Sequence, residues 1–392
     1  MGAGPVAQIQ DVPKHDNAQL VFRASHLFHM TIRHAESIAI SLPFEMGGPK
    51  PMFAGLPRQM DILLIRIETD DGLTGWGEAF GFAIWPATKS AFDKLIVPQL
   101  TGVDETDIAG IANKFQRQFH ILGRGGAATY ALSGLDIALW DIAGKRANKP
   151  LSALLGGAKH SSLPGYASLM RYADTTLVAR NTAEALKRGY RAIKLHEVGA
   201  AEVRAARAVM DADAALMMDV NCPWSVTQSL AMADQVRECN LLWLEEPVWP
   251  PEDFAGLAEV RKRGGIKTAA GENCISPAHF DYMMRAGAVD FAQPSVTKIG
   301  GVTAFMQVAQ MAARHGVTLM PHSPYFGPGL LATVQMLSTF TQETMVEYSF
   351  TDLGANPLGE AIAMNGGRIA VPQGPGLGRD PDRDIVNRYR VR

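Results

Sequence analysis

Short apolar runs that each lead into a polar side chain recur through the second half of this 392-residue chain. The step between neighbouring polar positions is 23 to 27 residues across Lys194, Asp219, Glu245, Glu272, Ser295, His322 and Glu347. One strand, one helix and two short loops need about this many residues. Repetition of such a unit predicts an α/β fold of the (β/α)8 type, a TIM-like barrel whose strand ends carry the active site.

Three consecutive positions in this series are carboxylates: Asp219 in MMDVN, Glu245 in WLEEP and Glu272 in AGEN. Three inward carboxylates at one barrel mouth repel one another strongly, and a cation between them removes the repulsion. Ligands that are all oxygen favour a hard ion such as Mg²⁺, and no Cys or His pattern here is typical of zinc. The pattern therefore predicts one Mg²⁺ per subunit.

Neighbouring residues on a strand point to opposite sides, so only one residue of the Glu245–Glu246 pair can face inward. We assign Glu245 to the inside because its spacing to the other two acids is the more regular. Asn221 and Asn273 follow two of the acids closely, and we expect them to support the ligand oxygens and bound water.

Lys194 and His196 lie two residues apart on the second predicted barrel strand and therefore point to the same side. His322 ends the seventh strand, nearly opposite His196 around an eight-stranded barrel. Two bases on opposite faces of a carboxylate bound to Mg²⁺ can remove and add protons at its α-carbon, which permits racemisation. They also permit elimination of water if one histidine acts as an acid on a leaving hydroxyl.

The part of the chain before the barrel divides into a loose extension at 1–29 and an α+β capping domain at 30–155. A strand begins near residue 30, a hairpin with its turn at 70–72 follows, and apolar spacing from 87 to 147 is helical. Alternation in MDILLIRIET suggests one well-buried face of the hairpin. The barrel then occupies 156–360, and 361–392 is expected to return to the capping domain.

Composition excludes several classes of function. The net charge of −2 with no basic block argues against nucleic acid and anionic membranes as partners. No apolar run approaches the ~20 residues of a membrane span, and no signal peptide is visible. Three cysteines, an odd number, suggest free thiols and a cytoplasmic location.

At this point the chain resembles the enolase superfamily, in its mandelate racemase-like subgroup, over roughly residues 30 to 385. The motifs that carry the resemblance are GLTGWGE, ALSGLDIALWDIAGKRANKPLSALLGG, KLH, DVN, EEP, GEN and KIGG. The resemblance implies that the metal ligands are Asp219, Glu245 and Glu272.

The same resemblance implies roles for the remaining strand-end residues. Lys194 would neutralise the substrate carboxylate, His196 would replace a base that is often lysine, and His322 would match the seventh-strand histidine base. Glu347 would hydrogen-bond the substrate carboxylate and the enediolate. A homo-oligomer, either a dimer or an octamer, is also implied.

Ser295 departs from the subgroup, whose sixth strand usually supplies an aspartate that pairs with the seventh-strand histidine. Without that aspartate His322 loses the group that orients it and supports its positive charge. His322 is then a weaker base, an acid or only a binding group. This favours a dehydratase over a racemase with two bases.

Substrate contacts are expected from Ser295, Arg171 and Glu347, and Lys298 is expected to support the barrel mouth. Loops 43–58 and 79–86 of the capping domain would close over the site and exclude water. Their aromatics, together with Trp224 and Trp249, predict a rather apolar mouth.

The sequence thus predicts a Mg²⁺-dependent enzyme that abstracts the proton α to a small-molecule carboxylate, most simply a lyase that dehydrates a sugar acid or another hydroxy acid to a 2-keto acid. Racemisation or epimerisation is the alternative. A barrel that binds carboxylates without catalysis is a second alternative, which the opposed bases argue against.

Overall fold

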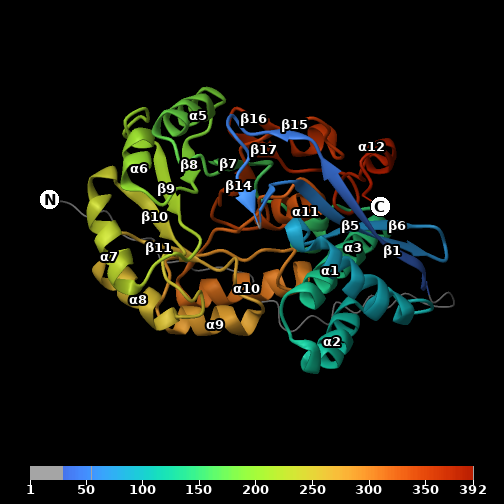
Figure 1. Ribbon diagram of the computed structural model, residues 1–392. Coiled ribbons are helices and arrows are strands. Elements are labelled where there is room, and N and C mark those ends of the chain that lie inside the picture. The colour runs from blue at the N-terminus through green and yellow to red at the C-terminus, as the bar shows by residue number, and fades with distance from the viewer. Residues whose placement is uncertain (1–29, 54, 392) are drawn as a thin grey trace.

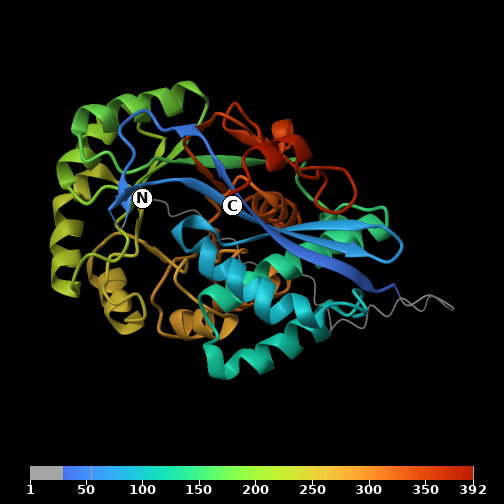
Figure 2. The same cartoon turned by 45° about the vertical axis from the view of Figure 1, so that its right-hand side comes forward.

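A computed structural model describes residues 30–53 and 55–391 of the chain. The predicted extension at 1–29 lies outside the described residues. Figure 1 and Figure 2 show two parts side by side: strands ringed by helices α5 to α10, and an antiparallel sheet with helices α1 to α3.

The capping sheet consists of β1 (Ile32–Leu42), β5 (Met60–Thr69) and β6 (Thr74–Ala79) in the order β1-β5-β6. The turn between β5 and β6 is where the sequence predicts it, and Gly72 there has a φ of +90°. One face of β5 is well buried, as predicted, and the opposite face is also covered at Ile62 and Leu64. Leu63 and Ile65 pack on the capping helices, whereas Ile62 and Leu64 belong to the core shared with the barrel.

The stretch 43–58, expected to close over the site as a loop, contains three strands of two residues each, β2 (Phe44–Glu45), β3 (Met52–Phe53) and β4 (Leu56–Pro57). β3 pairs with β4 in a small hairpin, and β2 pairs with β15 (Asp352–Leu353), which lies beyond the barrel. The short strand β2 forms only because the folded chain brings β15 beside it, and β15 lies about 300 residues later in the sequence.

The capping helices are α1 (Trp85–Ala91), α2 (Ile108–Gln118), α3 (Ala127–Arg146) and α4 (Leu151–Leu154). A π-helical turn at Phe92–Ile96 and 3₁₀ turns at Phe82–Ile84, Val97–Gln99 and Phe119–Leu122 join them. α3 crosses β6 so closely that a Cβ at Gly77 would lie 2.0 Å from the carbonyl oxygen of Gly134. Gly75 and Gly77 of GLTGWGE are therefore required by helix–strand packing, whereas Gly72 serves the turn.

Eight parallel strands form the barrel, in the order β14-β7-β8-β9-β10-β11-β12-β13. They are β7 (Ser162–Ser168), β8 (Ala192–Leu195), β9 (Ala215–Asp219), β10 (Leu241–Glu245), β11 (Thr268–Ala270), β12 (Phe291–Ala292), β13 (Thr318–Leu319) and β14 (Val346–Ser349). The predicted barrel is confirmed, with Glu272, Ser295 and His322 two or three residues beyond the last paired residue of their strands.

Seven helices alternate with these strands: α5 (Thr175–Lys187), α6 (Ala200–Arg207), α7 (Val226–Gln235), α8 (Phe254–Arg263), α9 (Pro277–Arg285), α10 (Gly301–His315) and α11 (Pro328–Leu337). A 3₁₀ turn at Arg237–Cys239 extends α7. The last strand, β14, leads directly into β15 and its pairing with the capping domain.

The barrel interior contains a layer of side chains directly below the predicted site: Tyr166, Ala192, Met217, Trp243, Ala269, Phe291 and Met320. Lys194, Asp219 and Glu245 each follow a member of this layer by two residues. Because side chains alternate along a strand, all three point inward as well. This places Glu245 inside the barrel and turns Glu246 away.

The segment after the barrel contacts both parts of the molecule. It contains a 3₁₀ turn (Gly359–Ile362), β16 (Met364–Asn365), β17 (Arg368–Ala370) and α12 (Arg383–Arg388). β17 pairs antiparallel with barrel strand β7, and the N–H of Val391 donates to the carbonyl of Ala39 on β1 at 2.8 Å.

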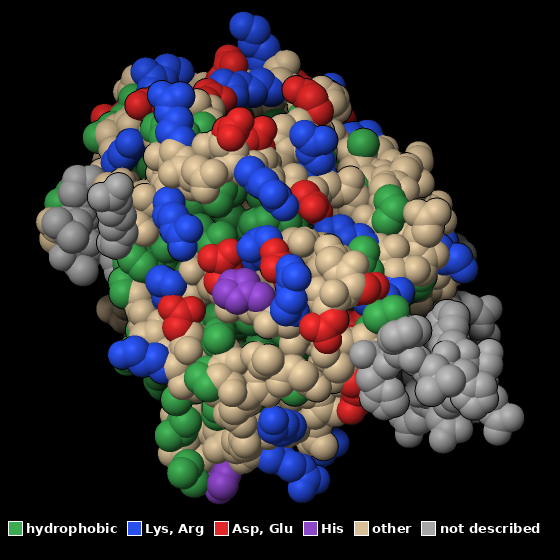
Figure 3. Space-filling view, turned by 90° about the vertical axis from the view of Figure 1, so that its right-hand side faces the viewer, with side chains coloured by type: hydrophobic (Ala, Val, Ile, Leu, Met, Phe, Trp, Pro, Cys, Tyr) green, Lys and Arg blue, Asp and Glu red, His purple; other side chains and the backbone are tan. Residues whose placement is uncertain are grey.

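On the face drawn in Figure 3, acidic and basic side chains are interspersed. Within residues 30–53 and 55–391, no helix combines the length and the apolar character that crossing a membrane requires. All three cysteines are buried free thiols.

Candidate active site at the carboxyl ends of the barrel strands

A cavity of about 610 Å³ lies between the capping domain and the ends of the barrel strands. The capping loops predicted to cover the mouth do contribute to it, through residues 51–52, 58–62 and 80–82. From the barrel, Arg171, His196, Asn221, Glu272, Asn273, Lys298 and His322 line the same space. Seven predicted site residues therefore border one cavity.

Lys194 lies fully buried beneath this cavity, and its ammonium group contacts three carboxylates. Its Nζ is 2.8 Å from Glu245 Oε1, 2.9 Å from Glu347 Oε1 and 3.1 Å from Asp219 Oδ2. Burial alone would lower the pKa of Lys194, but Glu245, Glu347 and Asp219 outweigh it and raise that pKa well above its usual value. The side chain is therefore a permanent cation below the site.

The predicted ligands Asp219 and Glu245 share Lys194, and one ammonium group cannot neutralise the carboxylates around it. Burial and the charge of Asp219 raise the pKa of Glu245 well above its usual value, although Trp243 Nε1 donates to its Oε2 at 2.8 Å. Burial would also raise the pKa of Asp219, but Lys194 and His196 outweigh it, so that this pKa lies below its usual value. The pair thus carries an excess of negative charge that a divalent cation would relieve.

The third predicted ligand, Glu272, pairs with His322, whose Nε2 lies 2.7 Å from Glu272 Oε2. Burial would raise the pKa of Glu272, but His322 and Lys298 lower it below its usual value. In the described part of the chain, no three acidic, histidine or cysteine side chains are already close enough together to hold a metal ion. Asp219, Glu245 and Glu272 therefore fit a hard divalent cation in type and number. To bind the cation, Glu272 would have to give up its contact with His322.

His196 has one ring nitrogen in a fixed role. Its Nδ1 lies 2.6 Å from the carbonyl oxygen of Leu169, and a carbonyl only accepts, so Nδ1 carries a hydrogen. Its Nε2 is 3.2 Å from Asp219 Oδ2 and faces the cavity. A cation that binds Asp219 would remove its contact with Nε2, and Nε2 would then be free to accept a proton.

His322 contacts two hydroxyl groups where the subgroup usually has an aspartate. Its Nδ1 is 3.2 Å from Ser295 Oγ and 3.3 Å from Tyr325 Oη, and these two hydroxyls also bond to each other. Ser295 is fully buried behind the imidazole, whereas a substrate contact was predicted for it. Tyr325 was missed, although it follows His322 by only three residues and lines the cavity.

Glu347, the other predicted substrate contact on a barrel strand, is fully buried. Ser168 Oγ donates to its Oε1 at 2.7 Å, and the backbone N–H of Ser323 donates to its Oε2 at 3.1 Å. Arg171 borders the cavity with an exposed side chain.

Of the two asparagines expected to support the ligands, Asn221 bonds a predicted ligand and Asn273 does not. Asn273 Nδ2 donates to Glu246, the outward carboxylate, at 2.8 Å, and not to Glu245. Asn221 bonds Asp219 through its backbone N–H, with 3.1 Å to Oδ1. Burial, followed by the charges of Glu272 and Asp219, raises the pKa of Glu246 to about 8.

The apolar lining comes only in part from the predicted residues. Phe80 and Phe82 border the cavity as expected, together with Met52, Met60, Met170 and Phe326. Trp224 and Trp249 are absent from the described lining, and Trp249 is 67% exposed. Three charged residues of the capping domain that also border the cavity, Arg58, Asp61 and Glu78, were missed.

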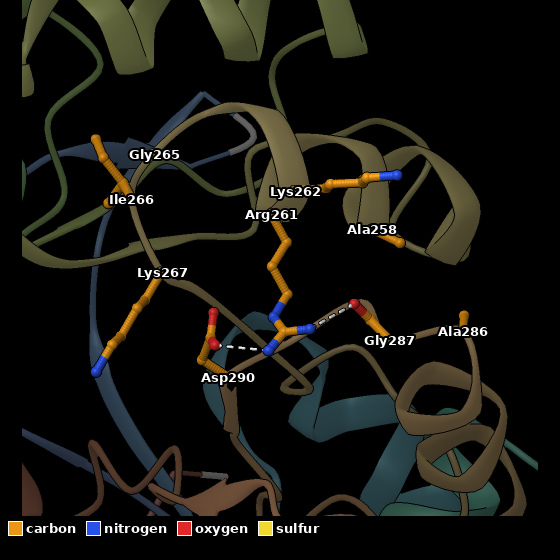
Figure 4. A pocket seen from close by; sticks show the side chains of 9 residues that line it. All are labelled: Ala258, Arg261, Lys262, Gly265, Ile266, Lys267, Ala286, Gly287 and Asp290. Atoms are coloured by element: carbon orange, nitrogen blue, oxygen red, sulfur yellow. Dashed lines mark hydrogen bonds and ion pairs between the residues drawn. The ribbon is translucent and has the colours of Figure 1, made fainter.

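A second hollow of about 490 Å³ lies at the opposite end of the barrel, where α8 leads into β11 (Figure 4). Its Arg261 is paired with Asp290 at 2.8 Å and bonds the carbonyl of Gly287. With no acid–base pair like that of the strand-end cavity among its described lining residues, this hollow is the weaker candidate for chemistry.

Two family models match the chain. Residues 39–156 match the mandelate racemase / muconate lactonizing enzyme N-terminal domain, and residues 177–385 match the enolase C-terminal domain-like family. Both matched segments agree with the two parts seen in the fold.

Three similar proteins are informative. The D-galactarolactone cycloisomerase of Agrobacterium fabrum is 32% identical over 84% of this chain and 91% of its own length. The L-talarate/galactarate dehydratase of Salmonella typhimurium is 31% identical over 85% of this chain and 82% of its own length. The crystal structure of a Streptomyces coelicolor racemase with bound magnesium has a TM-score of 0.82 at 28% identity, and covers 92% of this chain and all of that one. The chain therefore belongs to the mandelate racemase / muconate lactonizing enzyme family of the enolase superfamily.

Proposed function

We propose that this protein is a Mg²⁺-dependent enzyme that removes the proton α to the carboxylate of a hydroxy acid and eliminates water to leave a 2-keto acid. A sugar acid is the substrate class that the relative named L-talarate/galactarate dehydratase supports. The observation that carries the proposal is the pair His196 and His322, which border one cavity from the second and seventh barrel strands.

His196 is the proposed base. The carbonyl of Leu169 holds the hydrogen on Nδ1, so the lone pair of a neutral ring is on Nε2, at the cavity. A base that is held in one tautomer needs no rearrangement before it accepts the α-proton. Lys194 lies two residues before it and supplies positive charge below the developing enediolate.

His322 is the proposed acid. Its Nε2 contacts a carboxylate, Glu272, which accepts a hydrogen bond, so Nε2 carries a hydrogen in this arrangement. The doubly protonated ring of His322 can deliver that hydrogen to a leaving hydroxyl on the neighbouring carbon, which departs as water and leaves the imidazole neutral. Because neutral hydroxyls replace the usual aspartate at Nδ1, His322 is less suited to hold a proton taken from carbon, which favours elimination over racemisation.

Asp219, Glu245 and Glu272 are the proposed Mg²⁺ ligands. When bound, the ion would supply Lewis-acid stabilisation of the negative charge that develops on the substrate carboxylate. The capping residues above the cavity would keep bulk water away from the reacting carbon.

Cycloisomerisation is the second candidate, because the Agrobacterium fabrum relative carries that name. The same base would act, but the oxygen that leaves would remain attached to the substrate through a ring. Product identity separates this reaction from dehydration, and from racemisation or epimerisation, which leaves the carbon skeleton unchanged.

The test is incubation with Mg²⁺ in D₂O against a panel of aldonic, aldaric and lactone substrates, followed by NMR. A 2-keto product supports the proposal, whereas deuterium at the α-carbon of an otherwise unchanged acid would establish a racemase or epimerase. His196→Asn should lower α-proton removal by about 10²- to 10⁴-fold, while His322→Asn should retain exchange and lose elimination. His315→Asn, on the surface beside Asp281, is the matched control. No turnover over the whole panel would refute the dehydratase.

We also propose where the enzyme is located and how its subunits associate. The three unpaired thiols fit a reducing cytoplasm, and we propose a homo-oligomer, a dimer or an octamer, on the family resemblance alone. Size-exclusion chromatography with light scattering checks the second point.

A further inference from the structure

Arg58 is a half-buried cation of the capping domain that borders the cavity, and it has no carboxylate partner among the described residues. It follows the β3–β4 hairpin, and its backbone N–H donates to the carbonyl of Pro51 at 2.9 Å, which closes the base of that hairpin. The side chain therefore enters the cavity from the capping side, opposite the strand ends that carry Lys194.

The contacts of the guanidinium leave most of its donors without a good acceptor. Its Nη1 lies 3.1 Å from the thioether sulfur of Met170, a weak acceptor, and its central carbon lies 4.8 Å from the centre of the Phe82 ring. Its Nε is buried without a hydrogen-bond partner. Among the described residues, no carboxylate lies within ion-pair distance of Arg58.

A half-buried charge in this condition is costly, because the buried Nε has neither water nor a counter-ion to compensate for its lost solvation. Burial lowers the pKa of the Arg58 guanidinium, against the attraction of Glu272 and Glu347. Both of these carboxylates are already bonded elsewhere, Glu272 to His322 and Glu347 to Lys194. The space between Arg58 and the strand ends is therefore where a compensating anion belongs.

We propose that Arg58 binds a second carboxylate, at the end of the substrate away from the reacting carbon, so that the preferred substrates are dicarboxylic hydroxy acids. The inference rests on the proposed function for the identity of the first carboxylate. A planar guanidinium matches a carboxylate with two parallel hydrogen bonds, and the ring of Phe82 and the sulfur of Met170 hold it in position before binding. A phosphate would bring more negative charge toward Glu272 and Glu347 and fits less well.

The first experiment compares matched pairs of aldaric and aldonic acids that differ only at the far carbon, such as galactarate and galactonate. The wild-type enzyme should prefer the best aldarate over its aldonate partner by about 10²-fold in kcat/KM. Arg58→Met should remove that preference, mostly through KM, and leave the aldonate rate within a few-fold. Arg58→Lys should retain part of the preference, because lysine keeps the positive charge but cannot form the two parallel hydrogen bonds of a guanidinium.

Lys50→Met is the matched control, since Lys50 also packs on a capping-domain ring, Phe44 at 4.3 Å, but is not part of the described cavity lining. It should leave the preference intact. Equal losses for aldarate and aldonate in Arg58→Met would overturn the inference, because Arg58 would then bind the reacting end or only support the fold. Turnover restricted to a phosphorylated acid would overturn it as well.

A binding measurement separates this inference from the proposed function. Adipate and hexanoate have the same carbon chain and no leaving group, so calorimetric titration of the Mg²⁺-loaded protein reports binding without turnover. Tighter binding of adipate that is lost in Arg58→Met would support the anion site even if no panel acid reacted. Equal binding of adipate and hexanoate would refute the site even if dehydration were observed.

Discussion

Glu78 Oε2 on capping strand β6 accepts a hydrogen bond from the backbone N–H of Gly329, in the first turn of barrel helix α11, at 2.9 Å. A Cβ at Gly327 would lie 2.5 Å from the same oxygen, so the loop before α11 leaves room for this carboxylate only because residue 327 is glycine. That loop carries His322 and Tyr325. The contact therefore joins the capping domain to the segment that positions the proposed acid.

We predict that this contact makes stability depend on pH. Burial raises the pKa of Glu78 to about 8 from a usual value of 4.5, against the bonds from Gly329 and Gly327. The folded protein thus holds this proton where the unfolded chain releases it. The contribution of Glu78 to stability is fully present below about pH 4.5 and is lost as the pH rises through about 8.

Glu78→Gln keeps an acceptor for the Gly329 N–H and removes the titration. Between pH 5.5 and 8.5 the wild type should lose on the order of 3 kcal/mol more unfolding free energy than the variant. Urea denaturation of both proteins at the two pH values measures the difference. Parallel losses would show that Glu78 does not titrate in this range.

The two hydroxyls at His322 Nδ1 predict redundancy. Ser295 and Tyr325 both reach the same nitrogen, so Ser295→Ala or Tyr325→Phe alone should reduce kcat by about 3-fold or less. The double variant leaves the buried nitrogen without a partner and should reduce kcat by about 10- to 10²-fold. Steady-state kinetics on the best substrate provide the test, with Tyr348→Phe, whose hydroxyl bonds Ile362, as the control. Additive effects of the two single changes would contradict the idea.

Metal binding should affect stability through Glu245. Burial and Asp219 raise the pKa of Glu245, so without a divalent cation its ionised form destabilises the fold above the usual pKa. We expect Glu245→Gln to be at least as stable as wild type at pH 8 in chelator. Mg²⁺ at 100 times its Kd should stabilise the wild type by about 2.7 kcal/mol and the variant hardly at all.

Glu246→Gln is the adjacent control for this thermal-shift experiment, because Glu246 points away from the barrel axis toward Cys222 and Asn273. It should keep the response to Mg²⁺. If Glu246→Gln lost that response and Glu245→Gln retained it, the assignment of the inward carboxylate would be reversed.

Close packing between β6 and α3 predicts a large cost for Gly77→Ala. The added Cβ would lie 2.0 Å from the backbone oxygen of Gly134, and backbone atoms can move only if the helix moves. A loss of about 3 kcal/mol or more is expected. Gly102→Ala, at a φ of +78° with open space around it, should cost about 1 kcal/mol. Equal unfolding midpoints for the two variants would show that α3 shifts easily.

The sequence by itself determined the barrel and the inward positions of Lys194, Asp219 and Glu245. These depend on the βα period and on the alternation of side chains along a strand, both of which are local properties. The motif GLTGWGE could be recognised in the sequence. That Gly77 is needed because α3 packs against it could be seen only in the folded domain.

Only the tertiary structure decided what the strand-end groups contact. It placed Ser295 behind His322 with Tyr325 and turned Glu272 toward His322. It also brought Arg58 and Glu78 from the capping domain to a cavity whose other wall is formed by the barrel. It also left Trp249 exposed where the sequence suggested a lining residue. The physical reason is that these contacts follow from how two independently patterned parts dock. No periodicity within either part encodes the direction of a side chain across the interface between them.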